Sequence, residues 1–389
     1  MNPNTDFIPF AKPVLGVEEE EAVLRIMRSG WLTTGSETLA FEKEFADFVD
    51  SPRALAVNSA TSGLHLALEA LGIGKGDTVI TSPYTFTSSA AVVRHLGAEV
   101  KFCDTTFDSY NIDPIELERV LASTKNCRAI VVVHVGGLPC DMEAILPLAR
   151  RYGCAVVEDA AHAFPSRIQA GYAGTLGDVG VYSFYATKTI TTGEGGMIVS
   201  ANEKLATRMA TMRTHGIDRE VWDRYTSSTP SWAYQVMEAG FKYNLPDILS
   251  AIGRVQLRKA NGFLNERRSI ATSYDKAFSG SPGLTIPPRG EGHAWHLYSL
   301  RVDPEKAGMN RDTLIEALAS KGVGASVHFI PLHIMPYYAE RYGLTPDSFP
   351  HALSLYNDTL SLPIWQGMGA DRATRVAAAV LSALDTGRR

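Results

Sequence analysis

The sequence predicts an α/β fold built on a mostly parallel sheet that is covered by helices on both faces. Short runs rich in β-branched residues alternate with segments of helical periodicity, which is the pattern of successive βα units. The runs are apolar throughout instead of alternating with polar residues, as expected for strands buried on both faces. At 389 residues the chain exceeds an ordinary single domain, so a second, smaller domain is expected.

The first half of the chain carries most of the predicted sheet. Amphipathic helices at 14–28 and 36–49 precede a short strand at 54–57. A turn of small polar residues leads from that strand to a helix at 64–71. The alternation then becomes regular, with strands at 77–81, 99–103, 129–134 and 155–158, helices at 87–96, 114–123 and 141–152, and a β-like run at 179–184.

The second half contains longer connections. After a helix at 203–213, residues 215–243 form a polar and aromatic loop of a length that often has a function. A helix at about 246–278 is long enough to bridge two domains, and residues 281–292 are rich in proline and glycine, as at a boundary. These features predict a large domain at 1–250 and a small α/β domain at 251–389, whose elements are a strand at 296–302, a helix at 310–321, an apolar segment at 325–331 and a helix from 371.

Composition excludes several classes of protein. The net charge of −5 provides no basic surface for nucleic acid, and no apolar run is long enough to span a membrane. The N-terminus lacks the apolar core of a signal peptide, so the expected location is the cytoplasm. The four cysteines lack metal-site spacing and are expected to be buried thiols. The sequence contains neither a GxxxxGK[ST] phosphate loop nor a GxSxG elbow.

The turn between the first predicted strand and its helix, residues 58–63, resembles an anion site. Ligands of parallel sheets bind at the carboxyl ends of strands, and backbone N–H groups at a helix start favour negative charge. A purely structural alternative is that Thr61 or Ser62 caps the helix. Phe86, after the next strand, is either a core aromatic residue or a ring that stacks on a planar ligand.

An aspartate and a lysine follow two later strands. Asp159 could bind a metal together with Glu158 and His162, cap a helix, or pair with a protonated ring nitrogen. Glu158 and Asp159 are adjacent and should point to opposite faces of a strand, which weakens the metal alternative. Lys188 has apolar, small and hydroxyl neighbours, so a lowered pKa and a nucleophilic role are expected if the lysine is not simply structural. Pyridoxal phosphate is a cofactor that needs both groups.

Six segments together resemble one known family. They are SGWLTTG (29–35), NSATSGLHLAL (58–68), VEDAAHA (157–163), SFYATKTITTGEGG (183–196), GFKYNLPD (240–247) and VHFIPLH (327–333). The chain resembles the DegT/DnrJ/EryC1/StrS nucleotide-sugar aminotransferases from about residue 8 to the C-terminus. This resemblance implies the type I fold of pyridoxal-phosphate-dependent transferases and a homodimer with shared active sites.

The resemblance also implies roles for particular residues. Lys188 would form the Schiff base with pyridoxal phosphate and act as general acid and base, and Asp159 would pair with the pyridine nitrogen. Phe86 and His162 would lie on the two faces of the ring. The phosphate would be bound by Ala60, Thr61 and Ser183, and by Asn244 of the partner subunit.

The expected reaction transfers the amino group of L-glutamate to a nucleotide-linked keto sugar and releases 2-oxoglutarate. Stretches 220–227, 240–248 and 292–303 are most similar to members that make UDP-4-amino-4-deoxy-L-arabinose from a UDP-4-keto-pentose for lipid A modification. Lys242, His328 and Phe329 are the candidate substrate contacts. The alternatives are another UDP-, dTDP- or GDP-keto-sugar aminotransferase and a cofactor-binding regulator without turnover. Related sugar dehydratases have histidine in place of Lys188.

Overall fold

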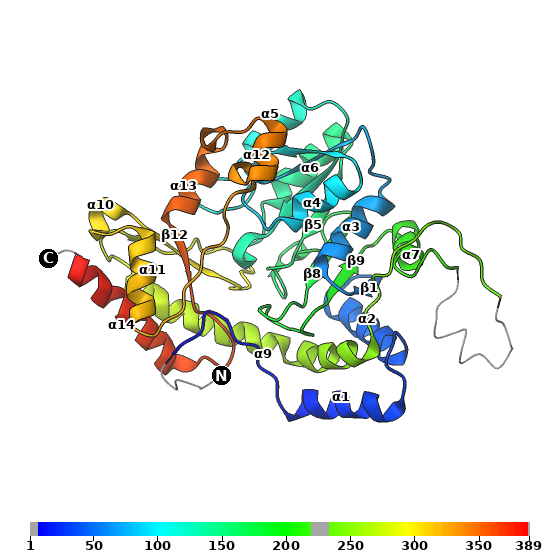
Figure 1. Ribbon diagram of the computed structural model, residues 1–389, viewed down its shortest axis with the longest axis horizontal. Helices are drawn as coiled ribbons and strands as arrows, with labels where there is room; N and C mark the ends of the chain where they lie inside the picture. The colour runs from blue at the N-terminus through cyan, green and yellow to red at the C-terminus, as the bar shows by residue number, and fades with distance from the viewer. Residues whose placement is uncertain (1–6, 219–232, 388–389) are drawn as a thin grey trace.

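A seven-stranded sheet forms the centre of the computed structural model, which describes residues 7–218 and 233–387 (Figure 1). The strand order is β1-β9-β8-β5-β4-β2-β3. Strand β9 runs antiparallel to both of its neighbours, while the pairs from β8 to β3 are parallel. The predicted mostly parallel α/β fold is therefore confirmed. The strands are β1 (Ala54–Val57), β2 (Thr78–Thr81), β3 (Glu99–Phe102), β4 (Cys127–Val133), β5 (Ala155–Asp159), β8 (Val179–Ser183) and β9 (Gly196–Val199).

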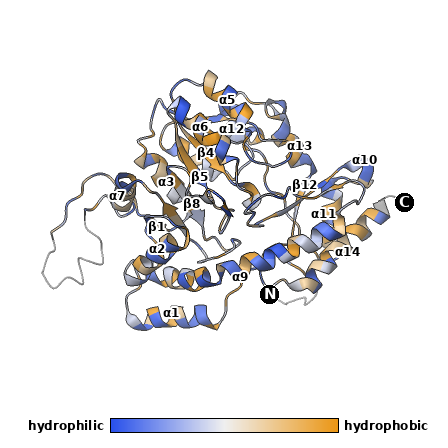
Figure 2. Cartoon of the chain, turned by 180° about the vertical axis from the view of Figure 1, so that it is seen from behind, coloured by the Kyte–Doolittle hydropathy of each residue, from blue (hydrophilic) through white to orange (hydrophobic). Residues whose placement is uncertain are grey.

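Helices cover both faces of this sheet. Successive side chains of a strand point to opposite faces, so Val157 packs in the core below α3, α4 and α7, whereas Val156 packs against α5 and α6. A third core joins β1 and β9 to α2 and α9. The central strands are strongly apolar in Figure 2. The helices are α2 (Ser36–Phe48), α3 (Ala60–Ala70), α4 (Ser88–His95), α5 (Pro114–Ser123), α6 (Met142–Tyr152), α7 (Glu203–Met212) and α9 (Asp247–Phe278).

Helix α3 begins at Ala60, four residues before the predicted start. Ser59 is the N-cap, because its Oγ accepts a hydrogen bond of 3.1 Å from the N–H of Ser62. The suggestion that Thr61 or Ser62 caps the helix is therefore wrong. Thr61 instead lies in the first helical turn, where backbone N–H groups have no acceptor within the helix.

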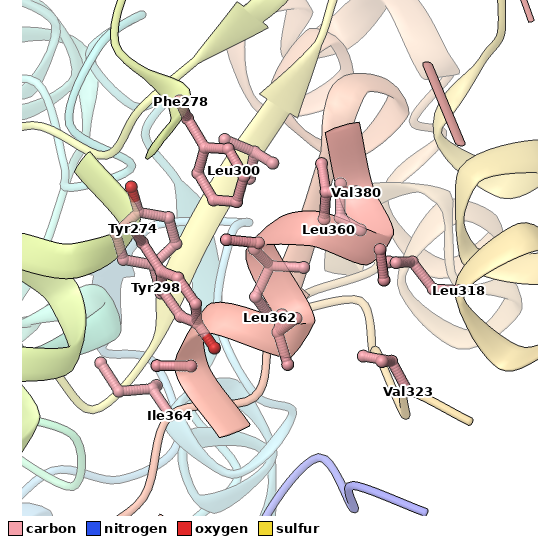
Figure 3. Close-up of a cluster of buried hydrophobic side chains, with 14 of the residues drawn as sticks. Tyr274, Phe278, Tyr298, Leu300, Leu318, Val323, Leu360, Leu362, Ile364 and Val380 are labelled. Carbon is pink, nitrogen blue, oxygen red and sulfur yellow. The ribbon is translucent and has the colours of Figure 1, made fainter. Parts of the chain in front are cut away.

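A second sheet, of order β10-β11-β12, lies at the other end of α9. Its strands pack with α11, α14 and the last turns of α9 around a separate apolar core, in which Tyr274, Tyr298 and Leu362 meet (Figure 3). The strands are β10 (Leu284–Thr285), β11 (Tyr298–Val302) and β12 (Thr359–Leu362), and the helices are α10 (Pro304–Ala307), α11 (Arg311–Ser320) and α14 (Gly369–Gly387).

The segment between this sheet's second and third strands contains elements that the sequence did not predict. Helices α12 (Pro336–Tyr342) and α13 (Pro350–Asp358) are short, and each begins with a proline that could equally mark a loop.

The chain also crosses between the two sheets. Ile8 packs in the core of the three-stranded sheet, whereas Tyr338 packs in a core of the seven-stranded sheet.

Two smaller features flank the main body. Helix α1 (Val17–Ser29) packs along α9, and β6 (Arg167–Ile168) and β7 (Gly171–Tyr172) form a small ribbon. In the predicted loop at 215–243, the bridges Thr214–Lys242 and Ile217–Val236 pair its two ends antiparallel, while residues 219–232 lie outside the described residues. Within the described ranges, no helix is both long and apolar enough to cross a membrane.

Candidate active site

A cavity of about 670 Å³ opens at the carboxyl ends of the parallel strands. Asp159 is the last residue of β5, Ser183 is the last of β8, and Ala60 follows β1. Chain topology therefore brings together side chains that are far apart in the sequence. Nine of the predicted site residues line this cavity: Ala60, Thr61, Phe86, Asp159, His162, Ser183, Lys188, His328 and Phe329.

One end of the cavity is suited to an anion. The first turn of α3 presents the backbone of Ala60 and Thr61, and the hydroxyl of Ser183 lies in the same wall. The start of β9 comes very close to this turn, since a Cβ added to Gly196 would lie 2.8 Å from the backbone nitrogen of Ala60. The position therefore requires glycine. N–H groups at a helix start together with a hydroxyl form a typical phosphate-binding arrangement.

The carboxylate of Asp159 is buried and fixed in orientation. Its Oδ2 accepts a hydrogen bond of 2.8 Å from the Ser89 hydroxyl, and its Oδ1 accepts one of 3.2 Å from the N–H of Ala161. Burial raises the pKa of Asp159, while both hydrogen bonds and the nearby positive charge of Lys188 act in the opposite direction. A protonated ring nitrogen would supply the opposite charge that this carboxylate needs.

Lys188 follows β8 in a turn closed by a hydrogen bond of 2.9 Å from its N–H to the carbonyl of Tyr185. Burial lowers the pKa of the Lys188 amine to about 8, and the positive charge of Arg267 acts in the same direction against the opposing effect of Asp159. An amine with this pKa is partly uncharged near neutral pH, as a nucleophile or proton carrier must be.

Aromatic rings form two walls of the cavity. The His162 ring stacks on Phe329 with centroids 5.5 Å apart, and its Nδ1 accepts a hydrogen bond of 3.3 Å from the N–H of Gly136. Burial, followed by the charge of Lys188, holds the pKa of His162 well below its usual value, so the imidazole is neutral with its proton on Nε2. Phe86 is not a core residue: its side chain faces the cavity and is 57% exposed.

The segment with His328 and Phe329 closes the cavity from the side of the three-stranded sheet. The hydroxyl of Tyr84 donates a hydrogen bond of 2.6 Å to the carbonyl of His328, and His328 Nδ1 lies 3.0 Å from Ser361 Oγ on β12. Burial lowers the pKa of His328 to about 4. The predicted apolar segment 325–331 is therefore an irregular connection that lines the site, with a bridge from Ser326 to β12.

Glu158 points away from the cavity, as the alternation of strand side chains predicts. Its two oxygens accept hydrogen bonds from the N–H groups of Gly174, Leu176 and Gly177, and His134 Nε2 lies 3.0 Å from Oε2. Glu158 thus anchors a loop on the far side of the strand. In the described part of the chain, no group of three or more His, Cys, Asp or Glu side chains is placed to hold a metal ion.

Lys242 and Asn244 are not among the residues that line the cavity of their own chain. Asn244 donates a hydrogen bond of 2.6 Å to the Thr34 hydroxyl, and the Lys242 amine donates to Asn244 Oδ1. Asn244 also bridges to Val57, so this segment lies along the edge of the sheet beyond β1.

Several residues that line the cavity or contact its lining were missed in the sequence. Ser89 lies inside the predicted helix at 87–96, where a serine gives no sign that it reaches a distant aspartate. His296 was assigned to a strand, yet it lies against His162 with ring centroids 4.3 Å apart. The remaining missed residues include Phe10, Thr85, Tyr185, Thr187, Glu194 and Ser326.

Comparison with known proteins identifies the family. The model of the DegT/DnrJ/EryC1/StrS aminotransferase family matches residues 13–381. The chain belongs to this family. It is 45% identical over 377 residues to the spore coat polysaccharide biosynthesis protein SpsC of Bacillus subtilis, with 96% of each chain covered.

Solved structures of family members have the same fold. PseC of Helicobacter pylori, described as an aminotransferase of pseudoaminic acid biosynthesis, superposes with a TM-score of 0.90 at 28% identity, covering 98% of this chain and all of the other. The sugar aminotransferase Spr1654 of Streptococcus pneumoniae, described as putative, gives 0.90 at 27% identity with the same coverage in its pyridoxamine phosphate form. A pyridoxal phosphate form of Spr1654 is also similar. The predicted family, fold and cofactor are thus confirmed.

Proposed function

We propose that this chain transfers the amino group of L-glutamate to a keto group of a nucleotide-linked sugar, using pyridoxal phosphate. The observation that carries the proposal is the presence of Asp159 and Lys188 in one cavity, which the start of helix α3 also lines with Ala60 and Thr61. Family membership and the sugar aminotransferases among the similar structures support the same class of reaction.

The residues of the cavity fit the cofactor group by group. When bound, pyridoxal phosphate supplies a carbonyl carbon for amines and a ring that accepts electrons. Asp159 would hold the proton on the ring nitrogen, because its buried carboxylate is stabilised by an adjacent positive charge. Phe86 and His162 would confine the ring between them. Ala60 and Thr61 would donate to the phosphate through their backbone N–H groups, together with the hydroxyl of Ser183.

Lys188 would perform the proton transfer. Its amine would hold the cofactor at the carbonyl carbon that the cofactor supplies, and the free amine would accept the proton from the donor's α-carbon. A pKa of about 8 allows the same nitrogen to accept and return that proton near neutral pH. The neutral His162, stacked on Phe329, would help to exclude water from one face of the site.

Substrate and subunit assignments extend this proposal. Lys242 and Asn244 would act in the site of a second copy of the chain in a homodimer, consistent with their position outside their own cavity. His328 and Phe329 would contact the sugar. The specific substrate that the sequence favours is a UDP-4-keto-pentose in the lipid A pathway. The relatives SpsC, named for spore coat polysaccharide biosynthesis, and PseC, described for pseudoaminic acid biosynthesis, favour other sugars.

The decisive experiment incubates the purified protein with L-glutamate and a panel of UDP-, dTDP- and GDP-linked 4-keto sugars, with mass spectrometry of the products. Nitrogen incorporation into one sugar nucleotide supports the proposal and names the substrate. Lys188→Ala should abolish it, whereas Lys321→Ala, which changes an exposed lysine, should not. A protein that binds pyridoxal phosphate but never converts it to the pyridoxamine form with glutamate would be a regulator, and the proposal would fail.

A further inference from the structure

A buried arginine lies behind the wall of the cavity. Arg267, in the middle of α9, is 1% exposed, and no carboxylate within residues 7–218 and 233–387 forms an ion pair with it. Its hydrogen bonds reach uncharged acceptors only. Burying a charge without an opposite charge is costly, so stability alone does not favour an arginine at this position.

The acceptors of Arg267 belong to the cavity wall. Nη1 donates to the carbonyls of Trp295, His296 and Ile364 at 3.1, 3.3 and 2.9 Å. Two of these three residues, His296 and Ile364, line the cavity. A single guanidinium therefore holds the segment before β11 and the segment after β12 against the middle of α9.

The same side chain is connected to the turn that carries the reactive lysine. Arg267 Nε donates to Gln366 Oε1 at 3.2 Å, and Gln366 Nε2 donates to the carbonyl of Thr189 at 3.1 Å. Thr189 directly follows Lys188 in the chain. The position of the Lys188 turn thus depends on Arg267 through one glutamine.

Arg267 also provides a positive charge that acts on Lys188 in the direction opposite to the charge of Asp159. Burial lowers the pKa of Arg267 only to about 10, so the guanidinium remains charged at neutral pH. The other ionisable groups around the cavity come from different elements: Asp159 from the end of β5, Tyr185 from the segment after β8, Glu194 from the turn before β9, and His162, His296 and His328. Burial lowers the pKa of all three histidines, so Arg267 is the permanent cation in the surroundings of Lys188.

We propose that Arg267 is a positioning residue for Lys188: it fixes the turn and the two cavity segments around the amine, and its uncompensated charge favours the uncharged form of that amine. This inference rests on the proposed function for its significance, since an uncharged amine matters only to a lysine that reacts. The physical effect does not depend on turnover. Lys188 is the group that would react, and Arg267 acts through it.

The test measures the protonation of Lys188 directly in the full-length, cofactor-free protein. An acylating reagent is applied in trace amounts between about pH 6 and 10, and the labelled fraction of the Lys188 peptide is quantified by mass spectrometry. The midpoint of labelling is expected at about pH 8. Arg267→Met should raise this midpoint by about one pH unit, because a charge that repels the protonated amine is lost. Arg267→Lys should keep the wild-type midpoint, because it retains the positive charge.

Two further variants make the result specific. Gln366→Glu keeps the side-chain size but places a carboxylate against the guanidinium, so it should raise the midpoint in the same direction, even if Arg267→Met does not fold. Arg311→Met removes another buried arginine that donates to backbone carbonyls, those of Tyr356 and Thr359, and should leave the midpoint unchanged.

The inference is overturned if a folded Arg267→Met protein keeps the wild-type midpoint, if Arg311→Met moves it equally, or if Gln366→Glu has no effect. In the cofactor-loaded enzyme, the pH at which the visible absorption changes should also rise in Arg267→Met. Failure of the proposed function would appear differently: no sugar would be aminated, while the labelling midpoints of Lys188 would still respond to the charge at position 267.

Discussion

The Ser89 hydroxyl lies 2.8 Å from Asp159 Oδ2 and connects the start of α4 to the end of β5. It is one of two fixed donors to this carboxylate, the other being the N–H of Ala161. Ser89 Oγ also lies 2.9 Å from the Thr85 hydroxyl, so its own orientation is fixed. These contacts hold the carboxylate in a fixed orientation in the wall of the cavity.

Ser89→Ala should weaken cofactor binding about tenfold, because a hydrogen bond to a buried charged group contributes about 1.5–3 kcal/mol. The loss is limited because the N–H of Ala161 still donates to the same carboxylate. The pKa of Asp159 should rise further, since Ser89 lowers it. Equilibrium titration of the cofactor-free protein, followed by visible absorption, measures the change. Ser123→Ala removes a serine that bonds only within α5, and an equal loss there would contradict the prediction.

Phe86→Ala should weaken cofactor binding by about tenfold without lowering the thermal stability of the cofactor-free protein. Stacking on a ring contributes about 0.5–1.5 kcal/mol beyond area burial, and a side chain that is 57% exposed supports little of the core. Phe86→Tyr should restore affinity. Phe107, which is 52% exposed and packs on Arg301 outside the cavity, provides the matched control. If the cofactor-free Phe86→Ala protein melts several degrees below the wild type, the ring supports the core instead.

Lys188→Met should stabilise the cofactor-free protein most at pH 7 and progressively less as the pH rises above 8. The folded-state pKa of Lys188 is about 8, below the usual 10.5, so below pH 8 the lysine is protonated in both states and the desolvation cost is fully present. Between pH 8 and 10.5, Lys188 is more often protonated in the unfolded state than in the folded state. The free energy of unfolding of the wild type therefore rises with pH toward that of the variant. Denaturant unfolding at several pH values measures this difference.

The cavity residues were predictable where chain topology determines their position. Asp159 and Ser183 end parallel strands, and such ends meet at one edge of a sheet. Ser89 and Arg267 were not predictable, because their contacts depend on tertiary packing between segments that are 70 to 99 residues apart. A serine in a helix and an arginine in an amphipathic helix are ordinary residues by local pattern.

The fold shows the same contrast. The seven-stranded sheet was predictable, because its apolar runs have the length and composition of buried strands. The start of α3 was placed four residues late because three nearby residues, Ser59, Thr61 and Ser62, could all cap a helix, and local pattern does not distinguish Ser59, which is the N-cap in the structure. Helices α12 and α13 were missed since they are too short to show a helical period.

Helix α9 joins the two sheets as one unbroken element of 32 residues, about 48 Å long. Asp247 at its first turn accepts hydrogen bonds from the N–H groups of Gly35 and Thr38, Arg267 holds the cavity wall at its middle, and Tyr274 packs in the second core near its end. The helix therefore connects the large sheet, the cavity wall and the second core as one continuous element. Because Arg267 binds the carbonyls of His296 and Ile364, a displacement of α9 would move both of these cavity residues with it.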